Sequence, residues 1–304
     1  MDTPSGPSCR QCGAAELDDL GPMPSADVFA GQPLEPPWPG GRLYRCRACE
    51  LGLRHPVAEA AVHERLYATA PEGVWTATEL RVDQRLVLDR LEASSGQRVL
   101  DVGCYDGTLL AAASDRWEKH GIEASAAAGR RARERGIRIV APRIRDLGGL
   151  GVRYDVICAV DVIEHLHDPR AFVATLAQQL APGGSLLIST GDFETPAWRR
   201  AGGAWWYGSF PEHLSFVSPG WARIVAGQLA LELVEAQRFA YATPHDAPLL
   251  ARRRRRLRRK LLERRLSALL PAALRPASSA KTIGEPGLVV DHVLLHLRRA
   301  APSS

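Results

Sequence analysis

The sequence predicts an α/β protein built on a doubly wound, mostly parallel sheet, preceded by a small N-terminal module that contains cysteine pairs. Three observations lead to this prediction. Apolar strands alternate with helical segments from about residue 78 onwards, a glycine-containing turn joins a strand to a helix at residues 98–110, and two C-x-x-C pairs lie near the N-terminus. A chain of 304 residues can form one large core and carry an accessory module.

The composition is that of an ordinary globular protein, with 45% apolar and 24% charged residues. No uninterrupted apolar run is long enough to span a bilayer, and the first residues do not resemble a secretion signal, so we expect a cytoplasmic protein. The formal charge of +5 is unevenly distributed. Residues 252–265 contain ten basic residues and one acid, which leaves the remainder of the chain mildly acidic.

The N-terminal module, residues 1–56, is rich in proline and glycine and has no long periodic segment. A segment with so small a core normally needs a covalent or metal cross-link. In a reducing compartment two C-x-x-C pairs indicate a metal rather than disulfides, and four thiolates can close a tetrahedral, structural zinc site. The predicted ligands are Cys9, Cys12, Cys46 and Cys49. On this interpretation His55 and His63 are surface residues.

Beyond the module, periodicity predicts the elements in order. A helix at 79–93 is followed by strand 98–103, helix 108–115, strand 119–124, helix 125–135, strand 137–142, strand 154–160, helix 169–180, strand 185–190, helix 219–230, strand 231–240 and a last strand within 287–298. Asp168 and Pro169 stand where an N-cap and a first-turn proline belong. The segment between 191 and 218 is predicted to be a long functional loop rich in tryptophan.

These elements divide the chain. The predicted parts are the cysteine module at 1–56, a linker and helical entry at 57–96, the core at 97–245, a basic amphipathic helix and loop insertion at 246–287, and a final core strand and tail at 288–304.

The residues of the glycine turn limit the kinds of nucleotide-like ligand that it can bind. A dinucleotide fingerprint would need glycine at positions 105 and 108, where the chain has Tyr105 and Thr108, and a phosphate-binding loop of the G-K-[S/T] type is also absent. Instead, Asp101 and Gly103 form the turn and Glu123 ends the next strand. An acid in the Glu123 position can bind a ribose diol, while Asp101 suits a cationic group. A nucleoside with an amino acid tail and no phosphate fits both, which indicates S-adenosylmethionine.

The ordered motifs VLDVGCYDG, GIEAS, YDVICAVDVIEHLHDP and LAPGGSLLIST resemble those of class I S-adenosylmethionine-dependent methyltransferases over residues 97–240 and the last strand. The resemblance implies a seven-stranded, Rossmann-like methyltransferase sheet. It also implies that the turn passes beneath the methionine part, that Glu123 holds the ribose, and that Asp146 and Asp161 border the cofactor. The predicted cofactor residues are Asp101, Gly103, Cys104, Tyr105, Gly107, Glu123, Asp146 and Asp161.

Tyr105 departs from the family, which usually has glycine or a small residue there. A positive φ would make tyrosine costly at this position, and otherwise its side chain is free to line the pocket. If it fills the pocket instead, the chain is a binding protein without catalytic activity.

The module sequence LDDLGPMPSADVF resembles the zinc-binding module of sugar C-methyltransferases of deoxysugar pathways, and WWYGSFPEHLSFVSP resembles their Tyr and His-Glu-His segment. The resemblance implies that His213 is a general base, with Glu212 as its partner and Tyr207 close by. The alternative is a histidine that only shapes a lid over the site. Pro211 replaces the first histidine of that segment, and the sequence lacks the long C-terminal domain of those enzymes.

Two further features carry alternatives. Glu164-His165 resembles an acid-histidine pair of some quinone O-methyltransferases, although a packed histidine at a helix entry is the simpler interpretation. Leucines at helical spacing predict a basic amphipathic helix over 252–270, which could dock on its own core, contact an anionic membrane, or bind nucleic acid, in that order of preference.

The sequence thus predicts methyl transfer from S-adenosylmethionine to a small molecule, a sugar or nucleotide-sugar of natural-product or polysaccharide biosynthesis, at carbon or oxygen. The alternatives are an RNA methyltransferase that uses the zinc module and the arginine-rich helix, and a non-catalytic binding protein.

Overall fold

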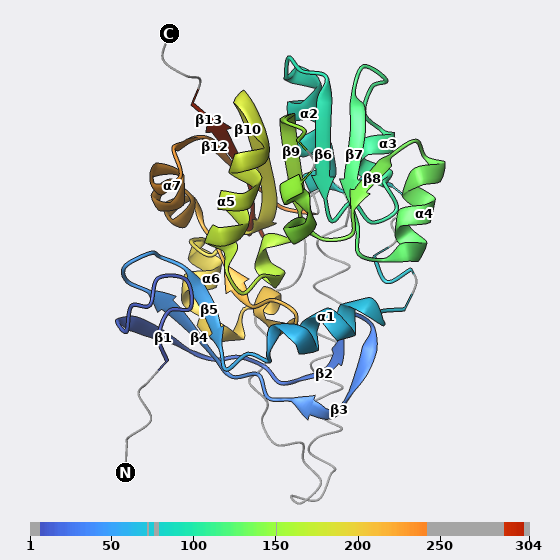
Figure 1. Ribbon diagram of the computed structural model, residues 1–304. Helices are drawn as coiled ribbons and strands as arrows, with labels where there is room; N and C mark the ends of the chain where they lie inside the picture. The colour runs from blue at the N-terminus through green and yellow to red at the C-terminus, as the bar shows by residue number, and fades with distance from the viewer. Residues whose placement is uncertain (1–6, 72, 76–78, 150, 242–288, 301–304) are drawn as a thin grey trace, which may run out of the picture.

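A seven-stranded sheet forms the centre of the molecule in the computed structural model, which describes residues 7–71, 73–75, 79–149, 151–241 and 289–300 (Figure 1). Its strand order is β12-β13-β10-β9-β6-β7-β8, and only β13 runs against its neighbours. The strands are β6 (Arg98–Val102), β7 (Glu118–Ile122), β8 (Arg138–Ala141), β9 (Tyr154–Val160), β10 (Leu180–Gly191), β12 (Leu231–Phe239) and β13 (His292–Arg299). The predicted doubly wound, mostly parallel sheet is therefore confirmed.

Helices cover both faces of this sheet because its central strands are apolar on both sides. In β9, Ile157 belongs to the hydrophobic cluster under α5 (Pro169–Gln179) and α7 (Pro219–Gln228). The next residue, Cys158, belongs to the cluster under α2 (Val82–Ala93), α3 (Thr108–Ala111) and α4 (Ala126–Glu134). The predicted cap is confirmed, because Asp168 accepts a hydrogen bond from Ala171 N and Pro169 opens α5.

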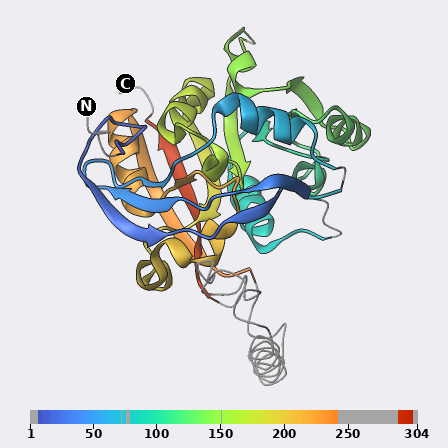
Figure 2. The ribbon, with the colours of Figure 1, turned by 90° about the horizontal axis from the view of Figure 1, so that it is seen from below.

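The N-terminal module lies across the carboxyl ends of the parallel strands, together with α1 (Ala60–Ala68) (Figures 1 and 2). It contains a hairpin of β2 (Ala26–Phe29) and β3 (Gln32–Trp38), and a sheet in the order β1-β4-β5-β11. The first three strands of that sheet are β1 (Leu17–Pro22), β4 (Arg42–Cys46) and β5 (Gly52–His55). The fourth, β11 (Ser215–Phe216), comes from the chain that follows β10, so the core completes the sheet of the module.

The segment predicted as a long loop instead contains three short helices, α6 (Pro196–Ala201), η3 (Gly202–Ala204) and η4 (Trp206–Ser209). Its tryptophans are buried rather than displayed. Trp198, Trp205 and Trp206 share a hydrophobic cluster with Met23 and Leu43 of the N-terminal module. Burial of such large apolar side chains against the module favours the ordered conformation over a loop.

Two 3-10 helices complete the fold, η1 (Ile144–Gly149) and η2 (Ile163–His165). Among the helices of the described ranges, none combines the length and apolar character that crossing a bilayer requires. The predicted insertion 246–287, with the basic segment 252–270, lies wholly outside the described residues.

Candidate active site

The turn after β6 requires glycine at two positions. Gly103 has φ 74° and donates its N–H to Ile122 O at 2.9 Å, which ties the turn to the end of β7. Gly107 has φ 78°, and a Cβ there would lie 2.8 Å from the Ile137 side chain. Both residues of the predicted motif are therefore glycine because the backbone is left-handed and closely packed.

Tyr105 also has a left-handed backbone, with φ 48°, which costs a residue other than glycine about 1–2 kcal/mol. Its side chain offsets this cost with contacts to the residues before α2. The hydroxyl accepts a hydrogen bond from Gly73 N at 3.1 Å, and the ring meets the Trp75 ring edge to face at 6.0 Å. The Arg131 guanidinium lies 5.6 Å from the ring centroid. Tyr105 thus joins the turn to segment 73–75.

Two carboxylates stand at the ends of neighbouring strands. Glu123 accepts hydrogen bonds from Tyr105 N at 3.0 Å and from Ser125 N at 2.6 Å, which fixes its orientation after β7. Asp101, in β6, is buried and has a hydrogen bond to the Cys158 thiol at 3.5 Å. Burial raises the pKa of Asp101 to about 7, and the negative charge of Glu123 adds to this effect. A bound ammonium group would supply a compensating cation.

The remaining predicted cofactor residues differ in their surroundings. Asp161, directly after β9, has φ 52° and forms an ion pair with Arg81 at 2.7 Å. Cys104 turns its thiol back towards Gly121, so only its backbone can face a ligand. Asp146 lies in η1 with an exposed side chain.

A buried hydrogen-bond cluster lies beside Asp161. Its central acceptor is Glu164, which belongs to the same motif, DVIEHL. The Tyr207 hydroxyl donates to Glu164 Oε1 at 2.6 Å, and Thr190 Oγ1 donates to Glu164 Oε2 at 2.9 Å. Burial raises the pKa of the Tyr207 phenol well above its ordinary value, which keeps it protonated and a donor. Tyr207 therefore acts within this cluster.

His213 presents one free ring nitrogen. Its Nδ1 lies 2.8 Å from the Tyr207 carbonyl oxygen, which can only accept, so Nδ1 carries the proton and Nε2 keeps its lone pair. Burial holds the pKa of His213 well below 6.5, so the ring is neutral at neutral pH. The ring lies 4.2 Å from the Tyr207 ring and 5.0 Å from the His165 ring, between centroids.

The expected pairing of Glu212 with His213 is wrong, because the hydrogen bond of Nδ1 goes to the backbone of Tyr207 instead. Glu212 is only 9% exposed, and its Oε2 is buried without a hydrogen-bond partner among the described residues. Its carbonyl oxygen lies 3.1 Å from His165 Nδ1. The Glu212 carboxylate instead faces a cavity.

This cavity, which we call the Trp75 cavity, has a volume of about 430 Å³. Trp75 and Phe210 line it with 42% and 40% of their surfaces exposed. Among the described residues of its lining, Asp27 and Glu212 are the acids, and none is a lysine or arginine. The other lining residues are Ser25, Ala26, Val28, Ala30, Gly31, Val74, Ser209 and Pro211. Apolar rings next to hydrogen-bond acceptors suit an uncharged ring that carries hydroxyl groups.

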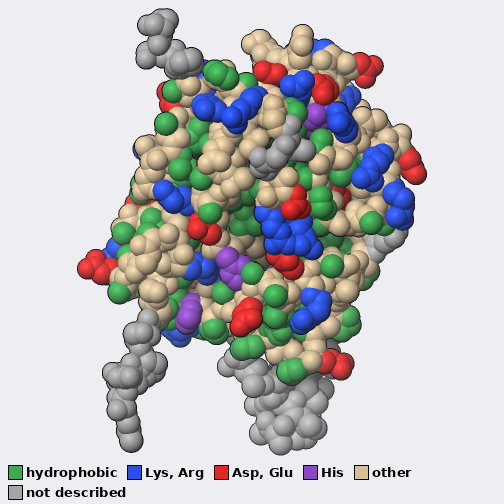
Figure 3. Space-filling view, viewed as in Figure 1, with side chains coloured by type: hydrophobic (Ala, Val, Ile, Leu, Met, Phe, Trp, Pro, Cys, Tyr) green, Lys and Arg blue, Asp and Glu red, His purple; other side chains and the backbone are tan. Residues whose placement is uncertain are grey.

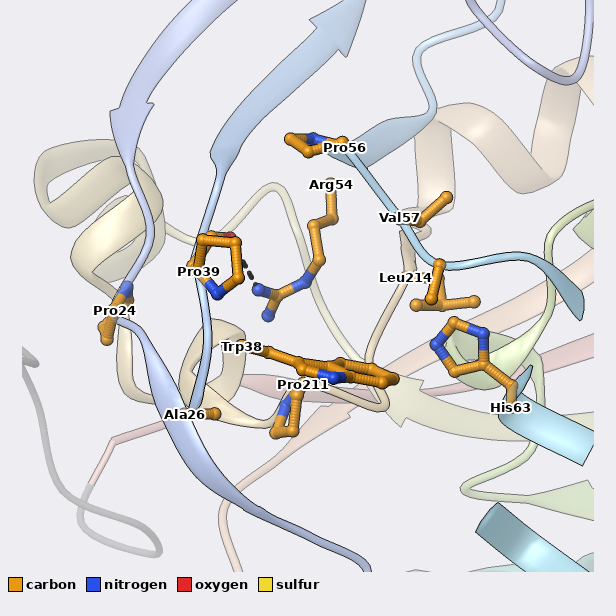
Figure 4. Close-up of a pocket in the computed structure, with 12 residues that line it drawn as sticks. Pro24, Ala26, Trp38, Pro39, Arg54, Pro56, Val57, His63, Pro211 and Leu214 are labelled. Carbon is orange, nitrogen blue, oxygen red and sulfur yellow. Dashed lines mark hydrogen bonds between the residues drawn. The ribbon is translucent and has the colours of Figure 1, made fainter. Parts of the chain in front are cut away.

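An adjoining cavity of about 260 Å³, the Trp38 cavity, lies where the N-terminal module meets α1 and segment 208–214 (Figure 4). Trp38, Arg54 and His63 line it, and Pro211 belongs to the lining of both cavities. The prediction that His63 is a surface residue is wrong. It is 4% exposed and packs against the Trp38 and His167 rings, because α1 turns it inward.

The four cysteines converge as predicted. Their sulfur atoms all lie within 4.8 Å of one another, with Cys9 Sγ 3.6 Å from Cys49 Sγ and Cys12 Sγ 3.5 Å from Cys46 Sγ. A tetrahedral metal with bonds of about 2.3 Å to sulfur needs separations of about 3.8 Å. The cluster could therefore hold a metal ion after a small adjustment.

The sequence indicated the hydrogen-bond role of Glu164 poorly. It suggested a dyad of Glu164 with His165, whereas the position of Glu164 after β9 in the motif DVIEH is the signal that places it in the buried cluster. Arg54 and Trp75 carry no local signal, because their partners are distant in sequence.

The sheet order and the two acids at strand ends define a nucleotide-binding, doubly wound α/β domain. Residues 77–226 match the model of a family described as a methyltransferase domain, so this part of the chain is a class I S-adenosylmethionine-dependent methyltransferase domain.

Curated relatives share part of this domain. The chain is 34% identical over 137 residues to a ubiquinone biosynthesis O-methyltransferase of Caulobacter sp. (strain K31), a match covering 40% of this chain and 54% of that protein. The corresponding protein of Cronobacter sakazakii is 29% identical over 123 residues, covering 38% and 51%. The chain thus spans about half the length of the curated relatives it matches.

Solved structures are also similar. One is a putative Haloferax volcanii methyltransferase in complex with the activator Trm112, with 16% identity, a TM-score of 0.49, and coverage of 71% of this chain and 88% of that chain. Another is the magnesium protoporphyrin IX methyltransferase of Synechocystis with bound S-adenosylmethionine, with 12% identity, a TM-score of 0.47, and coverage of 81% and 100%.

Proposed function

We propose that the protein transfers the methyl group of S-adenosylmethionine to a hydroxyl group of a small, ring-containing acceptor. One observation carries this proposal. Tyr105 of the cofactor turn contacts Trp75, and Trp75 lines the same cavity as Glu212. A cofactor site and an acceptor site would therefore share a wall.

The residues present fit the cofactor. The buried Asp101 carboxylate suits the ammonium group of the methionine part, and Glu123 suits the ribose hydroxyls. When bound, S-adenosylmethionine supplies a methyl group on a positively charged sulfur, which is electrophilic.

The protein would contribute orientation and a base. The Glu212 carboxylate would accept a hydrogen bond from one acceptor hydroxyl and so orient the ring. Neutral His213 would take the proton of the reacting hydroxyl at Nε2, which leaves the acceptor oxygen as the nucleophile. The Glu164–Tyr207 hydrogen bond would hold the segment that carries His213 in place.

The acceptor class follows from the Trp75 cavity. A sugar presents C–H faces to Trp75 and Phe210 and hydroxyls to the acids, and a phenol would do the same with one ring. We favour the sugar class that the sequence predicted, with any nucleotide diphosphate outside this cavity, since the lining offers no cation. The name of the curated relatives, O-methyltransferase, supports oxygen over carbon.

RNA is less consistent with this lining, because two carboxylates would repel a phosphate backbone. On the face drawn in Figure 3, basic side chains are interspersed with acidic ones, so the described residues of this face offer no continuous basic surface for RNA.

Membrane contact through 252–270 stays a prediction, since that segment lies outside the described residues.

We also propose that the four cysteines bind one zinc ion with a structural role. Four thiolates leave no open position for a substrate. Metal analysis of the purified protein should give one zinc per chain, and replacing Cys9 with serine should remove it.

The acceptor proposal is tested by transfer of labelled methyl from S-adenosylmethionine to a panel of free sugars, nucleotide-sugars, phenols and RNA. We expect label in a hydroxylated ring compound, and Glu212→Gln should raise the acceptor KM because the amide accepts more weakly. Label only in RNA, or an unchanged KM in the variant, would overturn the proposed acceptor site.

A further inference from the structure

Arg54 is a buried cation that binds only backbone carbonyls. It lies in β5 of the N-terminal module, is 5% exposed, and projects beside Pro39 and Trp38 (Figure 4). Among the described residues it has no ion pair within 4.0 Å. Burial lowers its pKa to about 10, so the guanidinium is still protonated at neutral pH.

The partners of the guanidinium are concentrated in segment 208–214, which begins at the end of η4 and leads to β11. Arg54 Nη2 donates to Gly208 O at 2.6 Å and to Phe210 O at 2.9 Å, and Nε donates to His213 O at 3.0 Å. Nη1 donates to Gly40 O at 2.8 Å, within the module. Four of the five N–H groups of the side chain are therefore used.

The same segment contains the two side chains that the proposed reaction needs, Glu212 and His213. Segment 208–214 precedes β11, and the backbone bonds that its carbonyls accept include only Arg54 N to Leu214 O and His213 N to Phe210 O among the described residues. The carbonyls of Gly208, Phe210 and His213 accept hydrogen bonds from the Arg54 side chain. A rigid guanidinium fork can bind three of them at once, whereas a lysine ammonium is a single point on a flexible chain.

Arg10, between Cys9 and Cys12, reinforces this arrangement. Its guanidinium donates to Leu214 O, to Ser215 Oγ at 2.9 Å, and to Arg54 O at 3.0 Å. Arg54 N in turn donates to Leu214 O at 3.0 Å. Two arginines of the N-terminal module thus hold consecutive parts of the chain that leads from η4 into β11.

We infer that Arg54 is a positioning residue that fixes segment 208–214 so that Glu212 and His213 face the acceptor. The N-terminal module therefore completes the acceptor site and does not bind the substrate at a separate site. This inference rests on the proposed function, but the placement of the segment can be measured without it.

The test compares Arg54→Lys with Arg47→Lys. The second variant is a matched control, since Arg47 also belongs to the module, its side chain is 64% exposed, and its guanidinium binds the carboxylate of Asp18. Amide hydrogen exchange is measured for His213 and Leu214, whose N–H groups donate to Phe210 O and Glu164 O. Acceptor kcat/KM and the affinity for S-adenosylmethionine are measured in parallel.

For Arg54→Lys we expect exchange at residues 213 and 214 to accelerate at least tenfold, with protection in β6 and β10 retained. Acceptor kcat/KM should fall about 100-fold while cofactor affinity stays within twofold. The control should match the wild type in every readout.

Unchanged exchange at 213 and 214 in Arg54→Lys would overturn the inference, as would a parallel loss of protection in β6. If the wild type methylates no acceptor, the proposed function fails, yet the exchange data still decide whether Arg54 positions the segment. If Arg54→Lys does not fold, Arg10→Lys replaces it with the same expected exchange at 213 and 214.

Discussion

Asp101 is the residue on which the cofactor assignment depends most. Its pKa of about 7 in the folded chain exceeds the ordinary value of 3.8. Between these values the folded chain binds a proton that the unfolded chain has lost, so stability falls as pH rises from about 4 to 7 and then stays constant. A carboxylate that destabilises the empty protein is consistent with a role in binding a cation.

Asp101→Asn should therefore stabilise the cofactor-free chain at pH 8 by about 1–3 kcal/mol while weakening S-adenosylmethionine binding at least tenfold, or about 1.4 kcal/mol. Urea unfolding at pH 5 and pH 8, with a cofactor titration at pH 8, checks both effects. The gain should shrink at pH 5, where the wild-type carboxyl is protonated. A variant that is less stable at pH 8 and binds the cofactor normally would contradict the assignment.

His213→Gln should lower kcat by about 10²–10⁴, the usual contribution of a general base, without changing cofactor affinity. Because burial keeps the pKa of His213 below 6.5, the wild-type rate should be flat through neutral pH and fall only in acid. Single-turnover rates from pH 5 to 9 measure this. If the variant retains full activity, His213 only shapes the site.

The sequence identified some of these residues and missed others for a physical reason. Asp101 and Glu123 end predicted strands, so their meeting follows from parallel-strand geometry. Arg54 binds carbonyl groups more than 150 residues away in the chain, and no local pattern encodes such a contact. The pairing of Glu212 with His213 failed because His213 Nδ1 binds the backbone carbonyl of Tyr207, a contact that no side-chain pattern encodes.

At the scale of elements, the two cysteine turns have the same geometry. Gly13 N donates to Cys9 O at 2.7 Å, and Glu50 N donates to Cys46 O at 2.9 Å. Gly13 has φ 76° and Glu50 has φ 60°, so each turn places a left-handed residue directly after its second cysteine. Only one of the two turns has glycine at this position.

Glu50→Gly should therefore stabilise the metal-loaded protein by about 0.5–1 kcal/mol, because glycine accepts this backbone without strain. Its partly exposed ion pair with Arg45, at 3.5 Å, is worth less than that. Gly13→Ala is the matched opposite change and should destabilise the turn. Thermal unfolding of both variants with excess zinc measures the difference, and a lower Tm for Glu50→Gly would refute the argument.

Elements with strong periodicity were predicted within a few residues, as the strands at 98–102 and 154–160 show. The short β11 was not predictable, since two residues give no periodicity and their pairing depends on β5. The tryptophan-rich segment was expected to be a loop because its glycines and prolines obscure three short helices.

At the scale of the molecule, the N-terminal module and the methyltransferase domain share a sheet, a hydrophobic cluster and hydrogen bonds. Arg10 lies between two cysteines and donates to the His167 carbonyl at 2.9 Å, while its neighbour Gln11 accepts from Trp221 at 3.0 Å. The sequence predicted the module but not its docking, because the contacts join residues of both parts.

Removing the metal should therefore affect the acceptor site more than the cofactor site. Chelation is expected to lower Tm by about 10 °C and to reduce methyl transfer, with S-adenosylmethionine affinity little changed. Addition of zinc should restore both properties. Full activity in protein shown to be free of metal would contradict a structural role for the ion.

The most direct test of the central claim is a calorimetric titration of S-adenosylmethionine into the zinc-loaded protein. The account predicts one site per chain, with binding at least tenfold weaker in Glu123→Ala because its hydrogen bonds to the ribose are lost. The contradicting result is a folded wild-type chain that gives no heat with S-adenosylmethionine or with S-adenosylhomocysteine at several temperatures. That result would show that Tyr105 closes the pocket and that the protein is not this methyltransferase.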